Sequence, residues 1–168
     1  EHLETALFLC PKCGSFSGLH SRGDKFFCEK CGMELRFNEY GYFEGDFVPY
    51  KTVLEWDKWQ REELKKRLAE VTDDDTVLFS DDDVHLAEVL PGKGTKPISD
   101  GTVRLYRDRI DFAGETVYLR DIDKMSVTLR DTLMFTACGR YCQAKSGKPY
   151  SALKYHMASR MLQGREFF

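Results

Sequence analysis

The 168-residue chain lacks a long apolar run, and none reaches the ~18 residues that a membrane-spanning helix needs. The pattern of a secretory signal peptide is also missing from the N-terminus. The sequence begins at Glu1 instead of a methionine, so we expect it to be a fragment of a longer polypeptide. Hydrophobic residues make up 42% of the chain, which is enough for a sizeable core and argues against a chain that is disordered throughout.

The sequence also lacks an overall basic charge, since its formal net charge is −3. The charge is divided unevenly: residues 1–100 carry 13 basic and 21 acidic residues, whereas residues 101–168 carry 12 basic and 7 acidic ones. Such a division is typical of two modules with different partners.

Four of the six cysteines form two Cys-x-x-Cys-Gly knuckles, Cys10 with Cys13 and Cys28 with Cys31. Two intervening residues let both sulfurs of a knuckle point at one ion, and the glycine after each pair relieves the tight turn. The regular pairing favours a metal site in a reducing cytosol over disulfide bonds.

Four thiolate ligands favour a tetrahedral zinc ion, with iron of the rubredoxin type as the alternative. A site with four protein ligands has no open position for water or substrate, so we expect the zinc to be structural. His20 lies between the knuckles in the sequence, and we expect it to be a surface residue because four ligands are already present.

The segment around the knuckles is too acidic for a nucleic-acid-binding ribbon. Between Phe8 and Phe47 there are five basic and six acidic residues, and four thiolates with Zn²⁺ add about two negative charges. The positive footprint that phosphate binding requires is missing. A nucleic-acid-binding zinc ribbon therefore remains the less favoured alternative, and we expect no nucleic-acid partner.

A helix is predicted over residues 53–71, where apolar residues recur at helical spacing after a capping box of Thr52 and Glu55. Short alternating segments with turn residues between them follow from Val84 onward and predict antiparallel strands. A final helix is expected between a Ser151 cap and a Gly164 stop.

The predicted fold is therefore mostly β with some α structure. We expect three parts: a zinc ribbon over 1–48, a linking helix over 49–72, and over 73–168 an antiparallel β-barrel closed by the C-terminal helix. Cys138 and Cys142 lie in the predicted strands, and we expect both to be buried free thiols.

The stretch "LFLCPKCGSFSGLHSRGDKFFCEKCGMELRFNEYGYFEG", followed by "TVLEWDKWQ", resembles the C-terminal extension of bacterial 1-acylglycerol-3-phosphate (lysophospholipid) acyltransferases. The segment "SALKYHMASRML" resembles the end of that extension. The resemblance implies a membrane-associated catalytic domain upstream of the ribbon, and a pleckstrin-homology-like (PH-like) or GRAM-like barrel downstream. The catalytic His-x4-Asp pattern of the family is absent from this chain, so we predict no catalytic residue and leave open whether it has any enzymatic role.

The resemblance implies a non-catalytic region that docks onto its own acyltransferase domain or associates with an anionic membrane. The basic residues predicted to meet anionic lipid are Arg104, Arg107, Arg109, Lys145 and Lys148. The corresponding location is the cytoplasm, including a peripheral position at the inner face of the membrane. The alternative is a zinc-stabilised module that binds protein without touching lipid.

Overall fold

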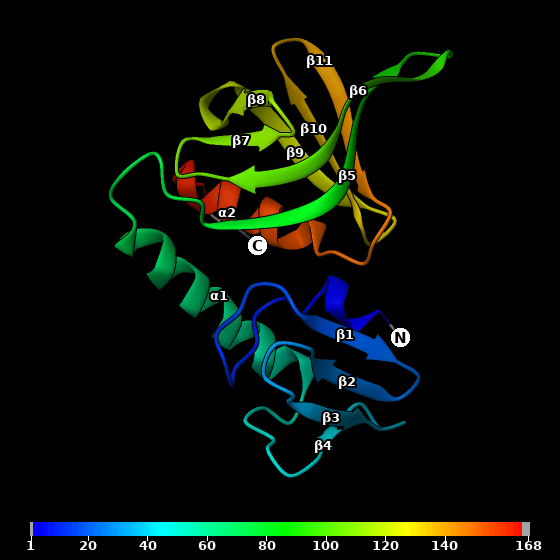
Figure 1. Ribbon diagram of the computed structural model, residues 1–168, viewed down its shortest axis with the longest axis vertical. Coiled ribbons are helices and arrows are strands. Elements are labelled where there is room, and N and C mark those ends of the chain that lie inside the picture. The colour runs from blue at the N-terminus through cyan, green and yellow to red at the C-terminus, as the bar shows by residue number, and fades with distance from the viewer. Residues whose placement is uncertain (1, 166–168) are drawn as a thin grey trace. The chain divides into compact units, whose positions relative to one another are not determined.

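The computed structural model describes residues 2–165 and divides the chain into two compact units, unit 1 (residues 1–66) and unit 2 (residues 67–168) (Figure 1). Each unit is built on one antiparallel sheet, and the described residues include two α-helices. The prediction of a mostly β fold with some α structure is confirmed. Neither described helix combines the length and apolar character needed to cross a membrane.

Unit 1 contains a small four-stranded sheet whose strands follow one another in the order β1-β2-β3-β4. Its elements are a short 3-10 helix η1 (Leu3–Thr5), β1 (Leu19–Arg22), β2 (Lys25–Cys28), β3 (Glu34–Phe37), β4 (Phe43–Glu44) and most of α1 (Val53–Glu70). Every connection joins strands that are adjacent in the sequence, so the sheet is a simple meander.

Helix α1 begins where the sequence predicts it. The Glu55 N–H donates to Thr52 Oγ1 at 3.2 Å, and Glu55 Oε2 accepts a hydrogen bond from the Lys51 N–H at 2.8 Å. These contacts satisfy N–H groups that the first turn of a helix leaves without partners. The helix ends one residue before the predicted boundary, at Glu70.

The core of unit 1 is aromatic and contains part of the cysteine cluster. Trp56 of α1 is fully buried, with its ring centroid 5.4 Å from that of Phe26 and 5.2 Å from that of Phe43. Cys10 and Cys28 belong to the same buried cluster. The knuckles are therefore continuous with the hydrophobic core.

Unit 2 contains a seven-stranded antiparallel sheet in the order β8-β7-β6-β5-β11-β10-β9. Its elements are β5 (Phe79–Leu90), β6 (Gly94–Leu105), β7 (Arg109–Phe112), β8 (Glu115–Tyr118), a 3-10 helix η2 (Leu119–Asp121), β9 (Ile122–Thr128), β10 (Thr132–Ala137), β11 (Arg140–Ser146) and α2 (Ala152–Leu162). Strands β5 to β8 form one meander and strands β9 to β11 another, and the pairing of β5 with β11 joins them.

The described residues do not form a closed barrel, because the sheet of unit 2 is open. Strands β8 and β9 lie at its two edges, although they are adjacent in the sequence. The 3-10 turn η2 separates them, and the N–H of Ile122 bonds within that turn to the Leu119 carbonyl. The turn redirects the chain from one meander to the other instead of forming a hairpin.

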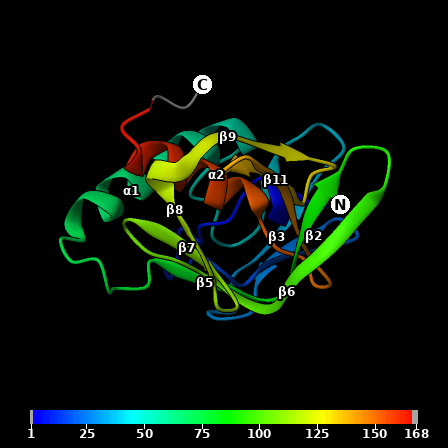
Figure 2. The same cartoon turned by 90° about the horizontal axis from the view of Figure 1, so that it is seen from above.

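Helix α2 packs against β9 and β10. Figure 2 shows α2 beside β9. Ser151 caps it by accepting a hydrogen bond from the Lys154 N–H at 3.4 Å, and Gly164 beyond its end has φ 70°. Lys154 lies on the buried side, where its Nζ is 2.7 Å from Asp81 Oδ2. The Tyr155 hydroxyl donates to the same carboxylate oxygen at 2.6 Å. A buried charged network thus ties α2 to β5.

Candidate metal centre

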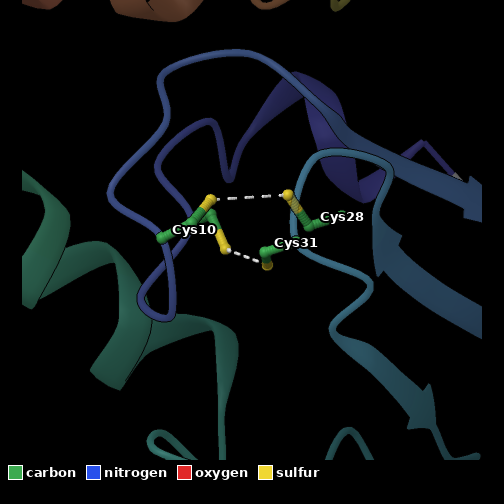
Figure 3. Close-up of side chains that lie close together, drawn as sticks. Cys10, Cys28 and Cys31 are labelled. Carbon is green, nitrogen blue, oxygen red and sulfur yellow. Dashed lines mark hydrogen bonds between the residues drawn. The ribbon is translucent and has the colours of Figure 1, made fainter.

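The structure brings the four predicted cysteine ligands together in unit 1. Cys10 Sγ lies 3.7 Å from Cys31 Sγ, and Cys13 Sγ lies 3.8 Å from Cys28 Sγ. All four sulfur atoms lie within 4.8 Å of one another, and all four cysteines are free of disulfides. Figure 3 shows the thiols of Cys10, Cys28 and Cys31 pointing toward a common centre. The arrangement could hold one metal ion.

The two knuckles have the same backbone conformation. The Gly14 N–H donates to the Cys10 carbonyl at 2.8 Å, and the Gly32 N–H donates to the Cys28 carbonyl at 2.9 Å. Both glycines have a left-handed backbone, with φ of 71° and 73°. Residues with a Cβ rarely adopt this conformation, so the glycine that follows each Cys-x-x-Cys pair is a requirement of the turn.

Backbone N–H groups point at the sulfurs and affect their ionisation. Burial raises the pKa of the Cys10 and Cys28 thiols above the ordinary value of 9.0, while N–H groups of their own knuckles act in the opposite direction. Burial also raises the pKa of Cys13, but the N–H of Ser15 and the neighbouring thiols outweigh it, so that the pKa is lowered overall. A bound cation would supply the positive charge that the buried thiolates require.

The cluster is partly accessible. Cys10 and Cys28 are buried, Cys31 is half-buried and Cys13 is exposed. An ion could therefore enter on the side of Cys13 while the opposite side is covered by the aromatic core. His20 is outside the sulfur cluster: its Nε2 lies 3.3 Å from Glu29 Oε2, and its ring packs near Phe27.

Two side chains of α1 hold the segment that leads into the first knuckle. Gln60 is fully buried; its Oε1 accepts from the Phe8 N–H at 3.1 Å, and its Nε2 donates to the Ala6 carbonyl at 2.8 Å. The Trp56 indole N–H donates to the Leu9 carbonyl at 2.9 Å. The "EWDKWQ" stretch therefore positions the backbone directly before Cys10, a role that sequence reasoning did not assign to it.

The five predicted anionic-surface residues belong to two parts of the unit 2 sheet, one at β6 and β7 and the other at β11. Arg104 is exposed on β6, Arg107 lies in the turn between β6 and β7, and Arg109 begins β7. Lys145 is on β11, opposite His85 of β5, and Lys148 is in the loop that follows.

Arg109 is already neutralised within unit 2. Its Nη1 lies 2.8 Å from Asp108 Oδ1 and its Nη2 lies 3.7 Å from Asp75 Oδ1, and the guanidinium lies 4.1 Å from the centroid of the Tyr106 ring. The charge of unit 2 as a whole is also balanced, with 15 basic and 16 acidic residues over 67–168. The excess of basic residues over 101–168 is therefore offset by the acidic residues of 67–100, which belong to the same unit.

The prediction for the two remaining cysteines is half right. Cys142 is buried on β11, and burial raises the pKa of its thiol. Cys138 is exposed in the turn between β10 and β11, where its φ of 52° places it in the left-handed region. Strand β10 ends at Ala137, so Cys138 lies one residue beyond the strand.

Comparisons with known proteins leave the family open. No protein-family model matches the chain, and no curated protein matches it significantly. A crystal structure of the C-terminal domain of an unknown protein from Leishmania infantum is similar in part, with 13% sequence identity over 64% of this chain and 95% of that chain. The TM-score of that comparison is 0.29, which does not establish a shared fold.

Proposed function

We propose that the chain is a non-catalytic region of a 1-acylglycerol-3-phosphate acyltransferase, in which a structural zinc ion holds unit 1 together and unit 2 serves as a PH-like docking or membrane-associating module. The observation that carries the zinc centre is the cluster of four sulfur atoms within 4.8 Å. Two ligands ~2.3 Å from a tetrahedral zinc ion lie about 3.8 Å apart. The closest sulfur pairs are separated by 3.7 and 3.8 Å.

A structural role is favoured because four thiolates complete the coordination of zinc and leave no site for a substrate or an activated water. The strands of unit 1 have only two to four residues each, and the cysteines are part of the core. A unit this small gains much of its folding free energy from the metal.

The zinc proposal is tested by measuring the metal content of the purified chain and then removing the metal with a chelator. We expect one zinc per chain, and unfolding of unit 1 when the zinc is removed. Both tryptophans of the chain, Trp56 and Trp59, lie in unit 1, so their fluorescence reports its unfolding. The circular dichroism of the β structure of unit 2 should persist.

Substitution separates the metal ligands from the other thiols. Cys28→Ser should lose the zinc, whereas Cys142→Ser, which removes a buried thiol of unit 2, should keep it. A full zinc content in Cys28→Ser would contradict the proposal. If the purified chain contained iron instead of zinc, the rubredoxin-type alternative would be favoured.

The PH-like assignment of unit 2 is supported by its topology. A four-stranded and a three-stranded antiparallel meander are followed by one helix that packs against the sheet. The acyltransferase context is supported by the sequence resemblance of the ribbon and of "TVLEWDKWQ", whose Trp56 and Gln60 fasten the segment before the first knuckle. Co-purification of this chain with the catalytic domain of such an enzyme would test the docking.

A membrane-associating role and a protein-binding role of unit 2 make different predictions. Anionic membrane association predicts sedimentation of the chain with phosphatidic-acid vesicles, weakened by salt and absent with phosphatidylcholine vesicles. The protein-binding alternative is favoured by strands β8 and β9, which are the edge strands of the sheet among the described residues, because a partner strand could add to such an edge. Absence of vesicle binding at every salt concentration would favour that alternative.

A further inference from the structure

A pocket of about 390 Å³ lies in unit 2 at the meeting point of three segments. The turn between β6 and β7 contributes Arg107, the segment from β8 into η2 contributes Arg120, and the residues that follow α2 contribute Arg165. Its volume is within the range of small-molecule binding sites in proteins, roughly 300–1,000 Å³. Only one of these three arginines belongs to the basic residues that the sequence singled out.

The three arginines are held by other parts of unit 2. Arg107 Nη1 donates to the Thr72 carbonyl, and Arg165 Nη1 donates to the Asp123 carbonyl at 3.1 Å. The guanidinium of Arg120 lies 4.8 Å from the ring centroid of Tyr118, which also lines the pocket. Since a guanidinium carries five N–H donors, each arginine keeps donors that can face a ligand.

The charge of the pocket lining is positive. The acidic residue in the lining is Asp108, and its carboxylate is already bound to Arg109, with Nη1 and Oδ1 separated by 2.8 Å. Arg120 Nε lies 4.0 Å from the Asp121 carboxylate, a long and exposed ion pair that contributes little. The three arginines of the lining thus outweigh its acidic charge.

The end of α2 at this pocket bears on anion binding. The C-terminus of a helix carries a negative partial charge, which opposes an anion. Here three of the last carbonyls accept hydrogen bonds at 2.9–3.0 Å from the N–H groups of Gln163, Gly164 and Arg165. This capping satisfies the exposed acceptors, and the nearby guanidiniums offset the remaining negative charge.

We infer that this pocket is a binding site for a phosphate monoester, held by Arg107, Arg120 and Arg165. Guanidinium groups match the geometry of phosphate oxygens and bind them through paired, charge-assisted hydrogen bonds. Because unit 2 has no net positive charge, a local site of this kind is what would draw it to an anionic ligand. That the phosphate belongs to a lipid rests on the proposed membrane association. The location of the site rests on the pocket alone.

The phosphate can belong to a lipid headgroup at a membrane surface or to a soluble ester, and the experiment separates these sources. The full chain with zinc is titrated with glycerol 3-phosphate by calorimetry, and is sedimented with phosphatidic-acid vesicles in parallel. The test variants are Arg120→Gln and Arg165→Gln. The matched control is Arg130→Gln, the same change at an exposed arginine in the turn between β9 and β10.

We expect each test variant to weaken binding by about tenfold or more, since each loses charge-assisted hydrogen bonds to the phosphate. The Arg130→Gln variant should bind like the unaltered chain. Thermal unfolding should be unchanged in all three variants, because the Arg120 side chain is 79% exposed and Arg130 and Arg165 are also exposed.

The outcomes distinguish the pocket from the membrane proposal. Loss of vesicle binding in the test variants but not in the control supports both. Binding of glycerol 3-phosphate that the test variants weaken, without binding to vesicles, supports the pocket and overturns the membrane association. Vesicle binding that the test variants leave intact, an equal loss in the Arg130→Gln control, or no binding of either ligand overturns the pocket.

Discussion

Replacing Gln60 by leucine tests whether the side-chain amide of Gln60 is required to hold the segment before the first knuckle. The substitution keeps a side chain of similar size but removes both hydrogen bonds to the backbone of Phe8 and Ala6. Phe8 is buried, so its N–H is left without an acceptor. Ala6 is half-buried, so its carbonyl can recover part of its loss from water.

The expected cost follows from these two groups. An unsatisfied buried backbone donor costs about 1–3 kcal/mol, and the half-buried carbonyl adds about 1 kcal/mol. We therefore expect Gln60→Leu to lower the free energy of unfolding of unit 1 by about 2–4 kcal/mol. The loss should also weaken zinc binding, because metal binding and folding of a small unit are coupled.

The assay is urea unfolding at a fixed concentration of free zinc, followed by tryptophan fluorescence, which reports unit 1 alone. The control is Lys58→Leu, at an exposed position of the same helix, which should change stability by less than about 0.5 kcal/mol. The reasoning would be refuted by a Gln60→Leu variant that unfolds at the same urea concentration as the unaltered chain, or no earlier than the control.

Three further changes probe other parts of the molecule. Lys154→Met should destabilise unit 2 by about 3–5 kcal/mol, because it leaves the Asp81 carboxylate buried without its cation, and the double variant with Asp81→Leu should recover most of the loss in thermal unfolding. If the double variant did not regain stability, the loss in Lys154→Met would be due to altered packing and not to the unpaired charge of Asp81. Gly32→Ala should weaken zinc binding by roughly tenfold in chelator competition, since its φ of 73° costs an alanine about 1–2 kcal/mol although a Cβ would meet no atom within 4 Å. In an NMR titration the pKa of His85, hydrogen-bonded to Asp100, should lie above 6.5, and burial should place the pKa of His156 below 6.5. The stabilising contribution of His85 is then present below pH 6.5 and is lost as the pH rises through its raised pKa. The contribution of His156 is present above pH 6.5 and is lost as the pH falls below that value. Equal pKa values for the two histidines would contradict the hydrogen bond of His85 and the burial of His156 as causes.

The features that the sequence predicts well are local ones. The knuckles are specified by cysteines and glycines within five residues of one another, so the spacing alone identifies the four sulfurs that come together. The start of α1 is specified by Thr52 and Glu55, which bond within a single turn. Neither feature depends on how distant parts of the chain pack.

The features that the sequence does not reveal depend on distant partners. Gln60 bonds to backbone groups 52 and 54 residues away, and nothing in a helical pattern distinguishes it from a surface glutamine. The sequence alone suggests that Lys154 is an exposed, charged residue of an amphipathic helix. Its burial depends on the ion pair with Asp81 of β5. A useful signal was the position of Lys154 one turn before Ala158, on the side of α2 that is buried.

The open sheet and the arginine pocket show the same limit. The number of predicted strands indicates a β unit, but it does not show which strands form the edges of the sheet. The edges depend on whether β8 pairs with β9, and the three-residue turn η2 between them prevents that pairing. Arg107, Arg120 and Arg165 are distant in the sequence, and only the folding of β6, β8 and α2 brings them around one pocket. A window along the sequence instead selects Arg104, Arg107 and Arg109 as a cluster.

The pairing of β5 with β11 has a consequence for how fast unit 2 folds. Each meander pairs strands that follow one another, so these contacts can form early at a small loss of chain entropy. The β5–β11 pairing, from Val84 with Ser146 to Glu88 with Cys142, joins residues roughly sixty positions apart. We therefore expect the formation of the β5–β11 pairing between the two meanders to set the rate of folding. Substitutions along it should slow folding, whereas substitutions at the hairpin tips should mainly speed unfolding.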